Sequence, residues 1–134
     1  MRGLTVLFLA LLSYAICNVA SAQDIRGRWV GTNRAVGSQI DYYATYVFLP
    51  RIARNGNQYG GHVEVSYTPF STNPPGWDKK VSRLYSFSHK TSENEISVVE
   101  NHPYEQRLWL EGEKMLGEVF EGSTLRSYLI LHRE

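Results

Sequence analysis

Residues 52–67 read IARNGNQYGGHVEVSY, and this stretch contains the pattern that decides the fold. Its dipeptide Asn55-Gly56 is typical of a type I′ turn, in which both central residues have a positive φ. After the turn, large apolar residues alternate with polar ones, which is the period of a strand with one buried face. The stretch therefore predicts a β-hairpin, and Gly60-Gly61 would allow its second strand to bend or bulge.

Similar short alternating runs, rich in Val, Ile, Tyr, Phe and Thr, lie on both sides of this hairpin. Pro50 cannot donate to a β-ladder, so the strand that contains it should bend, bulge or end nearby. Short turns join most of the runs, which requires neighbouring strands to pair antiparallel. Strands are expected at residues 25–32, 40–52, 58–67, 81–89, 95–100, 105–110, 115–121 and 124–133.

These expected strands, with no amphipathic helix between them, predict an all-β protein. We favour an eight-stranded antiparallel up-and-down β-barrel, because closure removes the exposed edges that an open sheet would present. A β-sandwich is the alternative arrangement for the same strands.

The first residues of the chain have the features of a secretory signal peptide, which we assign to residues 1–22. A positive residue precedes an apolar run at residues 4–16, and residues 20–22 read Ala-Ser-Ala, an A-x-A cleavage site. The run is shorter than the roughly 20 residues that a membrane-spanning helix needs. We therefore expect a secreted or periplasmic protein with one domain at residues 23–134. Lipid attachment through Cys17 is the alternative.

The overall charge is nearly balanced, with 14 Lys+Arg against 13 Asp+Glu, which argues against nucleic-acid binding driven by bulk charge. The hydrophobic content of 43% is enough to build a core. Cleavage after residue 22 would leave 112 of the 134 residues and remove Cys17, the only cysteine. The mature domain would then have neither disulfides nor a thiolate site. The histidines show no paired metal-ligand spacing, so we expect neither a metal nor a cofactor.

The first and last expected strands carry a pattern of their own. Gly27-Arg28-Trp29 forms a Gly-x-Trp on the first strand, and Arg133 lies on the last. This pattern resembles the calycin group of lipocalins, fatty-acid-binding proteins and avidins. The resemblance implies that Trp29 packs near the floor of the barrel and that a basic side chain lies across its indole, joining the two strands. Arg133 is our candidate for that side chain, and Arg126 is the alternative.

Tyrosines are frequent among the expected strands, and an eight-stranded barrel has room for packed side chains or for one small ligand. The phenols could donate to a polar group of a bound molecule, within otherwise apolar walls. Strand propensity explains the same aromatic content without a ligand. The candidate ligand-binding residues are Tyr46, Tyr59, Tyr67, Tyr85, Phe87 and Trp109.

The loop from Thr68 to Lys80 is the longest break in the alternating pattern, and it contains three prolines. Phe70 and Trp77 lie in it and are candidates for contact with a partner, because long loops often carry function. The alternative is that both aromatic residues close one end of the barrel.

Two functions follow as hypotheses. The first is an exported, lipocalin-like protein that binds an apolar or amphipathic small molecule. The second is an exported protein–protein interaction module, such as an inhibitor or an envelope-assembly factor, that uses the loop from Thr68 to Lys80. The sequence contains no catalytic motif, so we do not expect an enzyme.

Overall fold

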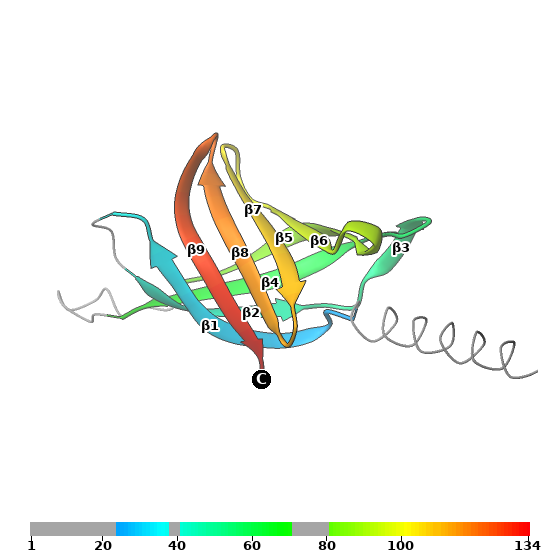
Figure 1. Cartoon of the computed structure of the whole chain (residues 1–134), viewed down its shortest axis with the longest axis horizontal. Coiled ribbons are helices and arrows are strands. Elements are labelled where there is room, and N and C mark those ends of the chain that lie inside the picture. The colour runs from blue at the N-terminus through cyan, green and yellow to red at the C-terminus, as the bar shows by residue number, and fades with distance from the viewer. Residues whose placement is uncertain (1–23, 38–40, 71–80) are drawn as a thin grey trace, which may run out of the picture.

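The structure is a computed structural model that describes residues 24–37, 41–70 and 81–134. Most of these residues lie in β-strands, and a single turn of 3-10 helix, η1 (Thr91–Glu93), connects two of them. Figure 1 labels the strands in chain order. The strands are β1 (Gly27–Ala35), β2 (Tyr42–Phe48), β3 (Ile52–Asn55), β4 (Gln58–Pro69), β5 (Val81–Lys90), β6 (Glu95–Val99), β7 (Tyr104–Glu111), β8 (Lys114–Glu121) and β9 (Thr124–Arg133).

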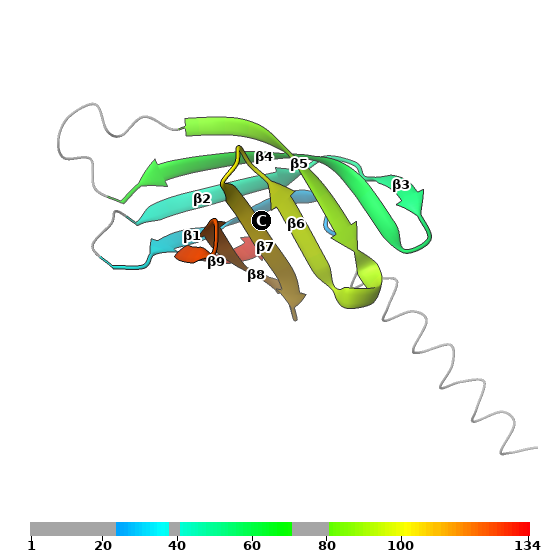
Figure 2. The same ribbon diagram turned by 90° about the horizontal axis from the view of Figure 1, so that it is seen from above.

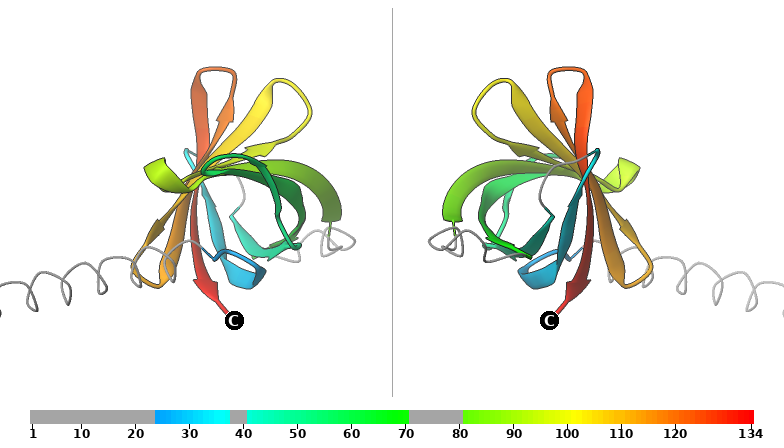
Figure 3. Two further views of the ribbon diagram at one scale, coloured as in Figure 1. Left: turned by 90° about the vertical axis from the view of Figure 1, so that its right-hand side faces the viewer. Right: turned by 90° about the vertical axis from the view of Figure 1, so that its left-hand side faces the viewer.

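The strands close into an eight-stranded antiparallel barrel, with β3 as an additional strand outside it. The sheet order is β2-β1-β9-β8-β7-β6-β5-β4-β3, and a further pairing of β2 with β4 completes the ring. In Figure 1, β7, β8 and β9 cross in front of β1, β2 and β4. Figure 2 shows the crossing from above, and Figure 3 shows the β6–β7 and β8–β9 hairpins projecting side by side. The predicted barrel is confirmed, and the sandwich alternative is wrong.

The strand expected at residues 40–52 consists of two strands. β2 ends at Phe48 and β3 begins at Ile52, with Pro50 in the gap between them. Both pair with β4: Phe48 lies opposite Val63, and β3 lies against the earlier residues of β4. The break follows from the chemistry of proline, which lacks the N–H that a continuous ladder requires.

The turn between β3 and β4 also differs from the expectation. Asn55 pairs with Gln58, so the two central residues are Gly56 and Asn57. Gly56 has a φ of 53°, whereas Asn94 is the only non-glycine residue of the described part that has a positive φ. The prediction of a type I′ turn is therefore wrong, because that turn needs a positive φ at both central residues.

The two glycines after this turn have a packing role and do not form a bulge with β5. The β4–β5 register runs without a shift from Gln58 to Tyr67. Gly61 lies opposite Phe87, and a Cβ at Gly61 would lie 3.0 Å from the Phe87 ring. Gly61 thus leaves space for an aromatic side chain in the core.

The inward-facing side chains form one apolar core, which extends toward both ends of the barrel. At the tryptophan end, where β1 begins and β9 ends, Trp29 is the largest buried side chain. At the tyrosine end, where β4 ends and β5 begins, the interior becomes polar. The buried apolar residues are Ile25, Trp29, Ala44, Tyr46, Phe48, Val63, Val65, Phe87, Ile96, Val98, Leu108, Met115, Val119, Leu129 and Leu131.

Candidate ligand-binding site

Three of the predicted aromatic residues meet inside the barrel. Tyr46 on β2 is fully buried, and Tyr67 on β4 and Tyr85 on β5 are half-buried. They share the inward face because each lies at an even spacing from buried core residues of its own strand. The Tyr46 and Tyr67 rings meet edge to face, with centroids 6.2 Å apart. The three phenols therefore define the tyrosine end of the interior.

The hydroxyls of Tyr46 and Tyr67 are joined to a buried amide. The two hydroxyl oxygens lie 2.6 Å apart, and the Tyr46 hydroxyl donates to Oε1 of Gln106 on β7. Nε2 of Gln106 donates to the Tyr67 hydroxyl at 3.2 Å. Each phenol has one proton to donate, and that of Tyr46 goes to Gln106. Tyr67 must therefore be the donor in the bond between the two tyrosines.

This chain of hydrogen bonds ends on the carboxylate of Glu100. Nε2 of Gln106 donates its second proton to Oε2 of Glu100 at 3.0 Å, and the Tyr85 hydroxyl interacts electrostatically with this carboxylate. Glu100 directly follows β6 and is half-buried, because it continues the inward alternation of Ile96 and Val98. Tyr46, Tyr67, Tyr85, Gln106 and Glu100 together form what we call the tyrosine–glutamate cluster.

The electrostatics of the cluster keep all three phenols protonated. Burial raises the pKa of Tyr46 well above its usual value, and the neighbouring Tyr67 and Glu100 raise it further. Burial is also the main cause of the raised pKa of Tyr67 and of Tyr85, and the Glu100 charge acts on both in the same direction. The three phenols are therefore neutral donors around a single acidic group.

Two more polar side chains enter the interior near this end. Asn33 on β1 is 9% exposed, and Ser127 on β9 is 7% exposed. Ser127 shares the inward face of β9 with Leu129 and Leu131, and Asn33 on β1 lies opposite Leu129. Their side chains add two polar groups to the interior at this end.

The other three predicted ligand-binding residues lie elsewhere. Tyr59 lies at the tryptophan end, where the Arg51 guanidinium stacks on its ring at 4.3 Å from the centroid. Phe87 belongs to the core and packs against Phe48, with centroids 5.2 Å apart. Trp109 is half-buried on the outer face of β7, because its neighbour Leu108 is the one that faces inward. The structure does not bring these three to the tyrosine–glutamate cluster.

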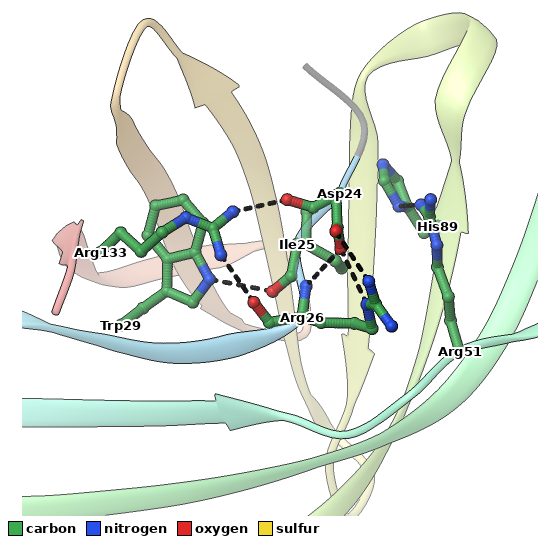
Figure 4. Close-up of polar contacts among 7 residues, drawn as sticks. All are labelled: Asp24, Ile25, Arg26, Trp29, Arg51, His89 and Arg133. Carbon is green, nitrogen blue, oxygen red and sulfur yellow. Dashed lines mark hydrogen bonds and ion pairs between the residues drawn. The ribbon is translucent and has the colours of Figure 1, made fainter. Parts of the chain in front are cut away.

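The tryptophan end is closed by side chains from both ends of the chain, as Figure 4 shows. The indole Nε1 of Trp29 donates to the carbonyl of Ile25 at 2.9 Å. The Arg133 guanidinium lies over the Trp29 ring at 4.4 Å from its centroid, and it donates to the backbone carbonyls of Arg26 and Asp24. This is the contact between first and last strands that the calycin resemblance implies.

Arg126, the alternative candidate for stacking on the Trp29 indole, makes a different contact. Its guanidinium binds the carboxylate of Glu121 on β8, with Nε at 2.8 Å. The stacking position over Trp29 is taken by Arg133.

A buried histidine lies beside this closure. His89 on β5 is fully buried, and Nη1 of Arg51 lies 3.1 Å from its Nδ1 (Figure 4). Burial lowers the pKa of His89 to about 4, and the Arg51 charge contributes to the shift. A neutral ring that accepts at Nδ1 carries its proton on Nε2, which has no hydrogen-bond partner. The surroundings of His89 therefore favour the neutral form of its imidazole ring.

Surface hollows also occur at the tryptophan end. One of about 530 Å³ lies beside Trp29, Arg133 and His132, and another of about 330 Å³ lies between Arg26, Arg51 and neighbouring residues. Trp29, which lines the larger hollow, is only 2% exposed and closes the floor of the barrel there. The polar interior groups that could hold a ligand are at the opposite end.

The long loop between β4 and β5 is described only at its start. Phe70 is partly exposed and packs against Tyr43, with centroids 4.3 Å apart, and the Arg34 guanidinium lies 5.0 Å from its ring centroid. Trp77, the second predicted partner residue, lies outside the described residues. The structure brings Tyr43, Phe70 and Arg34 together on the outer surface, in what we call the outer aromatic patch.

The described ranges contain no group of three or more His, Cys, Asp or Glu side chains arranged to hold a metal ion. Within the same ranges, no helix has the length and apolar character needed to cross a membrane.

Comparison with known proteins gives no relative. No family model matches the sequence, and no curated protein sequence matches it significantly. The class of protein is therefore defined by its strand topology: an eight-stranded antiparallel β-barrel, which is consistent with a calycin-like fold.

Proposed function

We propose that the protein is an exported, lipocalin-like barrel that binds a small amphipathic molecule at its tyrosine end. The observation that carries the proposal is the tyrosine–glutamate cluster, a set of hydrogen-bonding side chains inside the barrel whose outer members are partly exposed. Binding sites for small molecules are typically apolar with a few convergent polar groups. The inward-facing Val65 on β4, Val98 on β6 and Val119, which lies opposite Gln106 on the neighbouring β8, supply apolar surface around this cluster.

Export is the second part of the proposal. It is supported by the signal-like features of residues 1–22, namely a positive start, an apolar run and an Ala-Ser-Ala cleavage site. A fluorescent fusion would test it, because an intact leader sends the fusion out of the bacterial cytoplasm whereas deletion of residues 4–16 retains it. Equal retention of both fusions would contradict export.

The binding proposal is tested with N-phenyl-1-naphthylamine, a small neutral amphiphile whose fluorescence rises in an apolar environment. We expect saturable enhancement with the purified protein. Ser127→Phe would fill the tyrosine end from the inward face of β9 and should abolish the enhancement. Ile130→Phe adds a ring to the exposed face of the same strand and should leave binding unchanged.

Both variants are first compared by circular dichroism and thermal unfolding. A folded Ser127→Phe variant that binds the probe as well as the wild type would contradict a site at the tyrosine end. The absence of saturable binding by the wild type would contradict the proposed function itself.

The outer aromatic patch supports a second candidate function, an interaction with a protein partner. Tyr43 is 58% exposed and Phe70 is 37% exposed, and Arg34 lies beside them. Aromatic residues and arginine are enriched at the centres of protein interfaces. Recovery of a defined exported protein by the wild type, and its loss with a Phe70→Ala/Trp77→Ala variant, would favour this function. Equal recovery by both would contradict it.

A further inference from the structure

We infer that the molecule bound at the tyrosine end carries a protonated amine, which Glu100 recognises. This inference rests on the proposed function, since it names the chemical class of ligand for the same site. Three independent features of the tyrosine–glutamate cluster support it: the direction of its hydrogen bonds, the position of its charge, and the rings that surround this charge.

The hydrogen bonds of the cluster leave acceptors but few donors. The protons of Tyr46 and Tyr67 are used within the cluster, and both N–H protons of Gln106 are used as well. An ionised carboxylate accepts only, with roughly four lone-pair positions on its two oxygens. Glu100 receives one hydrogen bond from Gln106, so at least half of its acceptor capacity remains even if the Tyr85 hydroxyl donates to it. A group that binds to Glu100 itself must therefore bring donors.

The negative charge of Glu100 also lacks a close cation. Within the described ranges, no basic side chain lies within salt-bridge distance of its carboxylate. Arg83 lies two residues before Tyr85 on the same face of β5, and its charge acts on that phenol. However, Arg83 is exposed at the rim and its charge is screened by water. A ligand cation that reaches the half-buried carboxylate would make the stronger pair.

The rings around Glu100 favour the same charge. The faces of aromatic rings are electronegative and attract cations, whereas an anion would be repelled by them. Three phenol rings, those of Tyr46, Tyr67 and Tyr85, line this part of the interior. A primary ammonium group can donate to Glu100 while it contacts a phenol ring, which a carboxylate or phosphate cannot do.

The experiment compares three molecules with the same tail: decylamine, decanol and decanoate at pH 7. Their affinities are measured by displacement of N-phenyl-1-naphthylamine and by calorimetry. We expect decylamine to bind at least about tenfold tighter than decanol, a difference of about 1.4 kcal/mol, and decanoate to bind most weakly. Glu100→Gln keeps the shape and one acceptor of the side chain, so it should reduce decylamine affinity to that of decanol while decanol affinity stays constant.

Two further variants serve as controls for charge. Glu105→Gln removes one negative charge from the exposed face of β7 and should keep the preference for decylamine. Arg83→Gln removes the cation at the rim and should make decylamine binding tighter. Equal affinity for the three probes, a preference for decanoate, or an unchanged preference in Glu100→Gln would each overturn the inference. If neither N-phenyl-1-naphthylamine nor any decyl compound binds, the proposed function fails together with the inference.

Discussion

The two ends of the barrel use the same kinds of side chain in opposite ways. At the tryptophan end, Trp29 and Arg133 complete their interactions with backbone groups of the same chain. At the tyrosine end, the hydrogen bonds converge on Glu100, which retains acceptor capacity and is partly exposed. One end is therefore closed by its own residues, whereas the other presents a partly exposed carboxylate that can accept further hydrogen bonds. This difference is the reason that we propose the tyrosine end, and not the tryptophan end, as the place for a ligand.

Truncation of the closing tryptophan should have the largest effect on stability. Trp29→Ala removes a buried aromatic side chain and its bond to Ile25, and we expect a loss of about 3–5 kcal/mol in the free energy of unfolding. Trp109→Ala is the matched control, because it removes the same side chain from the outer face of β7. Urea denaturation of both variants measures the difference. Equal losses would mean that Trp29 does not have a special role in closure.

The buried histidine predicts a dependence on pH that belongs to the tryptophan end. The folded state has a pKa of about 4 for His89, against an ordinary value of 6.5. Between these values the unfolded chain binds a proton that the folded chain does not, so stability falls as the pH falls from 6.5 to 4. The full effect is on the order of 3 kcal/mol.

His89→Leu should remove this part of the pH dependence, and urea denaturation between pH 4 and pH 7 measures it. His62→Gln, on the exposed face of β4, is the control and should retain the wild-type slope. A His89→Leu variant with the wild-type slope would show that another group is responsible.

Removal of a hydroxyl from the buried part of the cluster should lower the free energy of unfolding more than removal of one at its rim. Tyr46→Phe leaves Oε1 of Gln106 and the Tyr67 hydroxyl without their partner, and we expect a loss of about 2 kcal/mol. Tyr85→Phe removes the hydroxyl of the least buried phenol, which water can partly replace, so a loss of about 1 kcal/mol is expected. Thermal unfolding measures both, and the reverse order would contradict the arrangement of the cluster.

The smallest effect is expected from the exposed arginine that covers Trp29. Arg133→Met removes the cation–π contact and two bonds to backbone carbonyls, and we expect a loss of about 1 kcal/mol. Arg126→Met removes an exposed ion pair with Glu121 and should cost less, about 0.5 kcal/mol. Denaturation in low salt compares the two variants. A larger loss for Arg126→Met would contradict the role given to Arg133.

Much of the fold could be predicted from the sequence, because strand formation leaves a local pattern. The alternation of residues located the strand regions, and Tyr46, Tyr67 and Tyr85 were among the residues predicted to face the interior. Pro50 correctly marked an interruption, but the sequence did not show that the chain resumes as β3 on the same partner strand. That outcome depends on hydrogen bonds with β4, which no local pattern contains.

The candidate site was predicted only in part. Gln106 and Glu100 were missed, although each shares the alternation of inward apolar neighbours, Gln106 with Leu108 and Glu100 with Val98. A polar residue at an inward position was the available signal. Trp109 was placed in the site because of its residue type, but its neighbour Leu108 occupies the inward position.

The sequence by itself determined which residues form strands and which face of each strand is apolar, because both follow from a period of two along the chain. The tertiary structure decided which side chains meet. The stagger of the strands in a closed barrel sets the level at which each side chain enters the interior. That stagger brings Tyr46, Tyr67, Tyr85 and Gln106 to Glu100 and leaves Tyr59 at the other end. It also joins the first and last strands, so that Arg133 covers Trp29.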